Sequence, residues 1–292
     1  MILEQFDLLG ADGARLAAFR RPATGAPRGV VQIAHGAGEH FGRYARLAGR
    51  LAEAGWSVYG QDHRGHGASR EVHGLGDFGP GGFGALVDDM AALSRAVRIE
   101  QPGAPLVLLG HSMGSFLAQL YVLEHAAMLS GLVLSGTAAT DLLMQHRAAQ
   151  GAEGGLARWN AAFEPARTPF DWLSRDEKEV DAYVADPLCG FDFTSESTGS
   201  MVEVASGAGQ DARFASIPRD LPLYVISGEL DPIVGPGQAF ANTLVERWRA
   251  AGFTDVEHRV YPGGRHEMFN ETNREEVTGE LIAWLDRSVT RA

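Results

Sequence analysis

The segment GHSMG at residues 110–114 places a serine between two glycines. It follows an apolar run at 105–109 and precedes a run with helical spacing, which is the strand–turn–helix setting of a nucleophile elbow. Such a serine stands on a sharp turn with its hydroxyl exposed. Side chains at positions 110 and 114 would collide with the neighbouring strand or helix. We therefore predict that Ser112 is a nucleophile.

A serine nucleophile needs a base within hydrogen-bond reach and an acid that fixes the tautomer of that base. With this elbow the order along the chain is serine, acid, histidine. His266, in the glycine-rich segment PGGRHE, is the predicted base. Asp231, in SGELDP at the end of a strand candidate, is the predicted acid, because the chain turns at Pro232. Glu229 is a rival for this role, and Asp255 is a weaker one.

Acyl transfer also requires backbone N–H groups that hold the oxyanion. One is expected from Met113, directly after the nucleophile, and another from the loop after the strand candidate at 29–34. Small residues in that loop let an amide approach the substrate, and we expect the Ala37 N–H to be this donor. Glu39 and His40 follow in the same loop. They either contact the substrate or hold the loop in place, and the sequence leaves both interpretations open.

Two further groups of reactive side chains are interpreted as structural. His63 and His66 lack a second set of ligands, so we expect a polar, glycine-bent loop and no metal site there. Cys189 is the one cysteine, so no internal disulfide can form, and its segment DPLCG is not a nucleophile elbow. The predicted chemistry requires no cofactor.

Apolar runs and helical spacing alternate along most of the chain. The strand candidates are residues 2–9, 15–20, 29–34, 56–59, 106–109, 132–135, 223–227 and 256–261. The helix candidates are residues 44–54, 86–99, 115–124, 238–251 and 275–289. The first two strand candidates are expected to form an antiparallel hairpin. The later alternation predicts an α/β fold with a mostly parallel central sheet wrapped by helices.

The alternation disappears between residues 137 and 206. A stretch of about 70 residues is too long for a plain loop in a compact domain. We predict an inserted helical cap at 137–206 and a core formed by 1–136 and 207–292. The apolar side chains of this cap either line a channel and pack on the core, or form a patch that docks transiently on micelles or bilayers. The residues of this stretch that we expect to contact a substrate are Leu142, Trp159 and Phe163.

The formal net charge of −12 bears on the partners of the chain. An acidic surface repels nucleic-acid phosphates and gives no electrostatic attraction to anionic lipids. The amino-terminal residues carry acidic side chains where a signal peptide has basic ones, and no apolar run is long enough to span a bilayer. We expect a cytoplasmic protein that does not bind nucleic acid, and the oligomeric state stays open.

Taken together in chain order, these motifs resemble those of the monoacylglycerol lipase and lysophospholipase branch of the α/β-hydrolases. The segments that carry the resemblance are HGAGEHFGRY (35–44), DHRGHGAS (62–69), GHSMG (110–114), GELDPIV (228–234) and GGRHE (263–267). One departure is Ser115, where the family usually has a second glycine after GHSMG. Serine is also small, so the helix packing should be kept.

The resemblance implies an α/β-hydrolase fold with a cap over an acyl-chain channel. It implies the triad Ser112, Asp231 and His266, and oxyanion amides at Ala37 and Met113. The implied activity is that of a serine carboxylic ester hydrolase that cleaves monoacylglycerols, or related single-chain lipid esters, through an acyl-enzyme. The alternatives are a lysophospholipase, a small-ester carboxylesterase, an aminopeptidase-like hydrolase and a non-catalytic ligand receptor.

Overall fold

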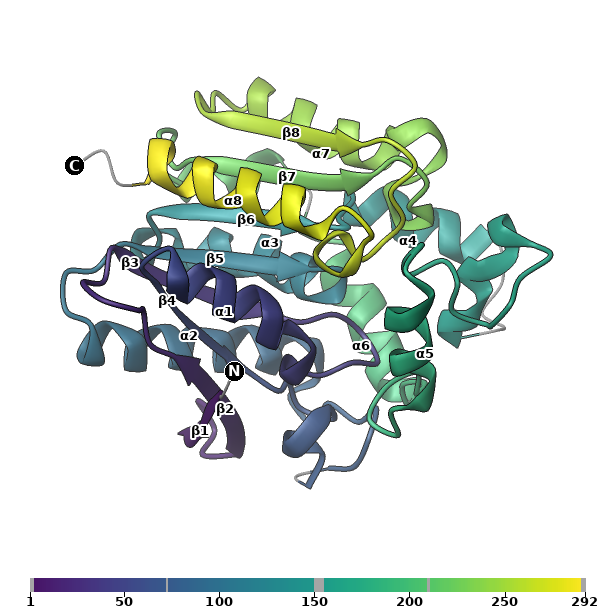
Figure 1. The fold of residues 1–292 in the computed structure, drawn as a ribbon, viewed down its shortest axis with the longest axis horizontal. Helices are drawn as coiled ribbons and strands as arrows, with labels where there is room; N and C mark the ends of the chain where they lie inside the picture. The colour runs from purple at the N-terminus through teal and green to yellow at the C-terminus, as the bar shows by residue number, and fades with distance from the viewer. Residues whose placement is uncertain (1–2, 72, 150–154, 209–210, 290–292) are drawn as a thin grey trace.

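A single eight-stranded sheet forms the centre of the molecule (Figure 1), in a computed structural model that describes residues 3–71, 73–149, 155–208 and 211–289. The strand order is β1-β2-β4-β3-β5-β6-β7-β8. The strands are β1 (Glu4–Leu9), β2 (Arg15–Arg21), β3 (Gly29–Ala34), β4 (Trp56–Gln61), β5 (Leu106–His111), β6 (Gly131–Ser135), β7 (Leu223–Gly228) and β8 (Val256–Tyr261). Strands β1 and β2 form the expected antiparallel hairpin, and β2 pairs antiparallel with β4. All pairs from β4 to β8 are parallel.

Helices cover both faces of this sheet. The helices around the sheet are α1 (Ala45–Glu53), α2 (Gly82–Glu100), α3 (Met113–His125), α7 (Ala239–Ala250) and α8 (Arg274–Ser288). Figure 1 shows α1 and α8 in front of the sheet and α2 and α3 behind it. The α/β fold with a mostly parallel sheet is therefore confirmed.

Strand β5 shows why the central strands are mostly apolar. Every residue of β5 is buried. Val107 and Leu109 pack into a cluster with side chains of α1 and α8, whereas Leu108 packs into a cluster with side chains of α2 and α3. Because neighbouring side chains of a strand point to opposite faces, a strand covered on both faces has no polar side. This packing fixes the position at which the chain leaves β5.

Between β6 and β7 the described residues form helices and turns. The elements are α4 (Thr140–Ala149), η4 (Gly155–Phe163), α5 (Glu177–Ala185), α6 (Ser195–Ala205) and η5 (Asp211–Ser216). Figure 1 shows α4, α5 and α6 beyond the arrowheads of the parallel strands. The stretch that we interpret as a cap therefore lies over the edge of the sheet at which the strands end.

No helix of the described residues combines the length and the apolar character needed to cross a membrane.

A buried charge network holds the hairpin against the rest of the fold. The guanidinium of Arg64, 1% exposed, donates to both carboxylate oxygens of Asp89 on α2 at 2.6 and 2.9 Å. It also donates to both oxygens of Asp12, in the turn between β1 and β2, at 2.7 Å. Asp89 is fully buried, whereas the side chain of Asp12 is 57% exposed. The two carboxylates therefore contribute differently to stability.

We predict that Asp89→Ala lowers the free energy of unfolding by about 3–5 kcal/mol, because it leaves the buried Arg64 charge without its inner partner. Asp12→Ala is the matched control, and we expect it to lower the same quantity by less than about 1 kcal/mol, because the lost pair is exposed. Urea denaturation of both variants gives the comparison. Equal losses would contradict the proposed division of the network.

Candidate active site

Ser112 stands on a strained bend between β5 and α3. Its φ of 52° and ψ of −122° lie in a region that side-chain-bearing residues rarely adopt. The backbones on either side approach closely: a Cβ at Gly110 would lie 2.4 Å from the Gly114 carbonyl oxygen, and a Cβ at Gly114 would lie 2.2 Å from that of Ala34. A side chain at position 110 or 114 would therefore collide with the neighbouring backbone, as expected. The bend turns the Ser112 hydroxyl toward the end of the sheet.

His266 is held by Asp231 through a buried hydrogen bond. The ring Nδ1 lies 2.9 Å from Asp231 Oδ2, and the two side chains are 2% and 0% exposed. The other carboxylate oxygen of Asp231 accepts from the Ile233 N–H at 2.9 Å. Since Nδ1 donates to a carboxylate, the lone pair of the ring lies on Nε2. That Nε2 is buried and has no hydrogen-bond partner among the residues that the structure describes.

Ser112 and His266 line the same small cavity, of about 20 Å³. Two glycines make room for them. A Cβ at Gly36 would lie 3.1 Å from Ser112 Cβ, and a Cβ at Gly136 would lie 2.7 Å from His266 Cε1. The structure therefore brings Ser112, His266 and Asp231 together from the ends of three different parallel strands.

The two rival carboxylates lie elsewhere. Glu229 is exposed, and its Oε2 accepts from the Gly263 N–H at 2.7 Å. Asp255 precedes β8, and its carbonyl pairs with the first residue of β7, so it lies at the opposite edge of the sheet. Neither is hydrogen-bonded to His266. The geometry therefore favours Asp231 as the partner of the histidine.

The loop after β3 brings the backbone amide of Ala37 to the cavity beside Ser112. Ala37 and Met113 line a larger cavity together with Ser112. Within the described part of the chain, the Ala37 N–H has no hydrogen-bond acceptor. Met113 is the first residue of α3, where an N–H has no partner inside the helix. Both amides are therefore available to an oxyanion.

Glu39 holds this loop in place. Its Oε1 accepts from the Gly36 N–H at 2.5 Å and from the Tyr44 hydroxyl at 2.8 Å, and its Oε2 accepts from Arg43 at 2.7 Å. Burial acts to raise the pKa of Glu39, but the nearby Arg43 guanidinium and the hydrogen bonds from Tyr44 and Gly36 together lower it below its ordinary value. The same guanidinium donates to both oxygens of Glu267, next to His266, at 2.5 and 2.7 Å. Sequence reasoning missed this bridge, and the contacts favour a loop-holding role for Glu39.

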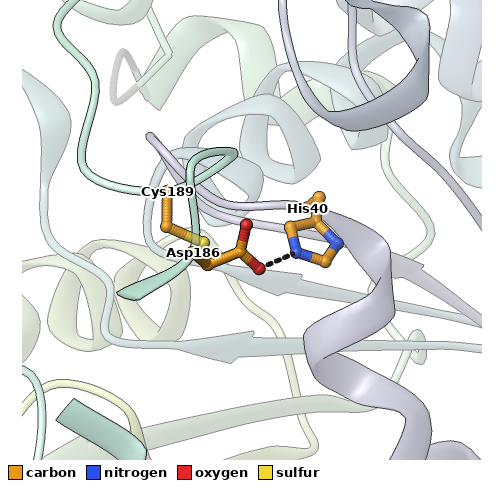
Figure 2. A group of neighbouring side chains, drawn as sticks. All are labelled: His40, Asp186 and Cys189. Atoms are coloured by element: carbon orange, nitrogen blue, oxygen red, sulfur yellow. Dashed lines mark hydrogen bonds and ion pairs between the residues drawn. The ribbon is translucent and has the colours of Figure 1, made fainter. Parts of the chain in front are cut away.

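His40 joins the same loop to the segment after α5. The Gly42 N–H donates to His40 Nδ1 at 3.1 Å, so the ring proton lies on Nε2 and is donated to Asp186 at 2.9 Å. Figure 2 shows this bond with Cys189 beside it, and the ligand atoms of the three residues lie within 4.8 Å of one another. A cation at Nε2 would need a proton on Nδ1, which would then face the Gly42 N–H. We therefore interpret the group as a structural contact.

A larger cavity of about 580 Å³ opens beside Ser112. Of the three cap residues expected to contact a substrate, Trp159 lines it. Leu142 packs against the core cluster. The ring centroid of Phe163 lies 4.5 Å from Cζ of Arg265. Neither of these two lines the cavity. The apolar side chains of the wall are Met113, Phe116, Leu143, Met144, Leu156, Trp159, Trp172, Phe191, Phe193, Met201 and Ile233.

Comparison with known proteins gives consistent matches. The family model described as serine aminopeptidase, S33, matches residues 25–273. The chain is 34% identical to the monoglyceride lipase of Homo sapiens over 98% of this chain and 91% of that one. It is 32% identical to the monoacylglycerol lipase of Mycolicibacterium smegmatis, over 89% and 88% of the two chains. A solved carboxyl esterase from Bacillus coagulans, in complex with glycerol, is similar with a TM-score of 0.84, 29% identity and 99% coverage of both chains.

The sheet, its covering helices and the bend at Ser112 define the molecule as an α/β-hydrolase. Within this class the chain belongs to the serine aminopeptidase S33 family, whose model covers most of its length. It is a hydrolase of the serine ester hydrolase class, similar to monoglyceride lipases. The resemblance inferred from the motifs is therefore confirmed.

Buried histidines surround the loops of the site. Burial is the main cause that lowers the pKa of His35 and His66 to about 3 and that of His111 to about 4. Both nitrogens of His35 and of His66 take part in hydrogen bonds. Nε2 of His35 accepts from the His63 N–H, and Nε2 of His66 accepts from the Gly38 N–H. In each ring, Nδ1 donates to a backbone carbonyl. The folded protein therefore keeps these rings neutral.

We predict that the free energy of unfolding falls on acidification between about pH 6.5 and pH 3. The unfolded chain binds a proton at each histidine below its ordinary pKa of 6.5, whereas the folded chain keeps His66 neutral down to about 3. Each such histidine contributes up to about 1.4 kcal/mol per pH unit in this window. His66→Gln removes one, so urea denaturation between pH 4 and 6 should show a slope that is shallower by about one proton. An unchanged slope would contradict the burial argument.

Proposed function

We propose that this protein hydrolyses monoacylglycerols to a fatty acid and glycerol through an acyl-enzyme on Ser112. The observation that carries the proposal is the meeting of Ser112 with the unpartnered Nε2 of His266 at one cavity. A buried base with its lone pair free has the geometry that activates a serine hydroxyl. The similarity to monoglyceride lipases supports the substrate class.

The proposed reaction has two steps. In the first, Ser112 Oγ attacks the ester carbonyl while His266 Nε2 takes its proton. The Ala37 and Met113 amides donate to the oxyanion, and His266 then gives the proton to the departing glycerol oxygen. In the second, His266 takes a proton from water, which attacks the acyl-serine carbonyl. The bond between the acyl carbon and Ser112 Oγ then breaks, His266 returns the proton to Ser112 Oγ, and the fatty acid leaves. Asp231 keeps the ring in the required tautomer and stabilises its positive charge.

The wall of the large cavity supports a single-chain lipid ester as substrate. It consists mostly of hydrocarbon and aromatic side chains, and a cavity of about 580 Å³ is of the size that holds a small-molecule ligand. An acyl chain in this cavity removes apolar area from water, which stabilises the complex.

Ser112→Ala is expected to lower the hydrolysis of monooleoylglycerol by at least about a thousandfold and to abolish labelling by a fluorophosphonate probe. The reason is that Ser112 is the only serine or threonine among the described residues that line the small cavity with His266. Ser288→Ala, at the end of α8, is the matched control and should label like the wild type. Full activity of Ser112→Ala would overturn the proposal.

The same assay with lysophosphatidylcholine and with short-chain esters separates the substrate classes. Activity confined to the lysophospholipid would establish the lysophospholipase alternative, and activity confined to short-chain esters would establish a carboxylesterase. A wild-type protein that fails to label at all would establish a non-catalytic role.

Asp231→Asn is expected to lower kcat by about four orders of magnitude, because an amide can no longer fix the ring tautomer or stabilise the imidazolium. Glu229→Gln is the matched control. Its side-chain oxygen can still accept from the Gly263 N–H, and we expect kcat close to the wild-type value. A large loss in Glu229→Gln with a small loss in Asp231→Asn would exchange the roles of the two residues.

A further inference from the structure

The large cavity changes from hydrocarbon to charge along its length. Its inner wall is formed by buried side chains, which are Phe116, Leu143, Met144, Met201 and Ile233. Its rim carries Arg147, which is partly buried, and Asp192, which is exposed. A ligand that extends from Ser112 past the inner wall therefore meets the Arg147 guanidinium and the Asp192 carboxylate.

The two rim charges have no bonded partner within the part of the chain that the structure describes. Neither Arg147 nor Asp192 forms a side-chain hydrogen bond or an ion pair with any residue that the structure describes, although the two attract each other. Burial, and the nearby Arg158, lower the pKa of Arg147. Asp141 and Arg247 offer a contrast at the other end of α4, because they pair through two bonds at 2.7 and 2.8 Å. Among the described residues, therefore, no carboxylate pairs with Arg147 in the way that Asp141 pairs with Arg247.

The proposed reaction decides which part of the substrate reaches this rim. The departing oxygen must lie beside His266, because that ring returns the proton to it. His266 faces the small cavity of about 20 Å³, whose other side chains include Glu39, Tyr183 and Glu267. These polar side chains suit the hydroxyl groups of glycerol, whereas the wall of the large cavity is mostly apolar. The acyl chain consequently extends through the large cavity toward Arg147.

We propose that Arg147, together with Asp192, limits the length of the acyl chain and makes the enzyme selective for medium-chain esters. This inference rests on the proposed function and names its substrate class more narrowly. Within the inner wall each added methylene strengthens binding by about fourfold. Beyond it, a longer chain displaces water from the Arg147 guanidinium and offers no hydrogen bond in return. The gain in binding from each added methylene therefore stops at the rim.

The experiment compares kcat/KM for monoacylglycerols from octanoyl to stearoyl in mixed micelles of one detergent. The wild type should prefer a medium chain. Arg147→Met keeps the apolar stem and removes the charge, and it should raise the stearoyl-to-decanoyl ratio about tenfold. Arg147→Lys keeps a charge and should keep a ratio near that of the wild type. Because the ratio is taken within one preparation, a smaller folded fraction cancels.

Arg95→Met, on the exposed face of α2, is the control for loss of a positive charge far from the cavity. Equal ratios in Arg147→Met and Arg147→Lys would overturn the inference, and so would a wild type that prefers stearoyl esters. In both cases hydrolysis itself persists, so the proposed function stands. Failure of the wild type to cleave any monoacylglycerol would overturn the proposed function and the inference with it.

Discussion

The close approach of two backbones around Ser112 is the constraint on which the site depends. The bend needs glycine at 110 and at 114, because the carbonyls of Gly114 and Ala34 occupy the space of a side chain. It also holds Ser112 at a positive φ, a conformation that costs on the order of 1–3 kcal/mol. Strand β5 and helix α3 are buried on all sides and fix the two ends of the bend. The fold therefore holds the serine in a conformation that the isolated segment would not keep.

The parallel topology then decides what surrounds the bend. The loops after β3, β5, β7 and β8 leave the sheet at the same edge, so residues far apart in the chain meet there. Arg43 joins two of these loops, because it binds Glu39 in the loop after β3 and Glu267 beside His266. Helix α5 contacts the loop after β3 through the Tyr183 hydroxyl, which donates to the Gly38 carbonyl. The segment of His266, the loop after β3 and helix α5 are therefore positioned by one connected set of bonds.

Much of the core was predictable because its signals are local. The apolar run at 29–34 became β3 with the same bounds, and 256–261 became β8. Helix α2 begins four residues earlier than expected, at Gly82, because the Phe83 N–H near its start donates to Ser200 on α6. Helix α3 begins at Met113 for a related reason, since it starts directly at the bend. Such ends depend on partners distant in the sequence, which spacing does not reveal. The start of the first strand candidate at Ile2 lies outside the described residues.

By itself the sequence determined the kind of sheet, the position of the bend and the positions of two polar strand ends. It also determined the order serine, acid, histidine. These features could be predicted because strand periodicity and glycine-flanked turns are properties of short segments. The tertiary structure alone decided which of Asp231 and Glu229 is hydrogen-bonded to His266. The two residues are two positions apart in the chain, and the turn points their side chains in different directions. It alone showed that Trp159 faces the cavity while Leu142 and Phe163 do not. The direction of a side chain in an irregular segment depends on what packs against it, and that is fixed only when the whole chain has folded.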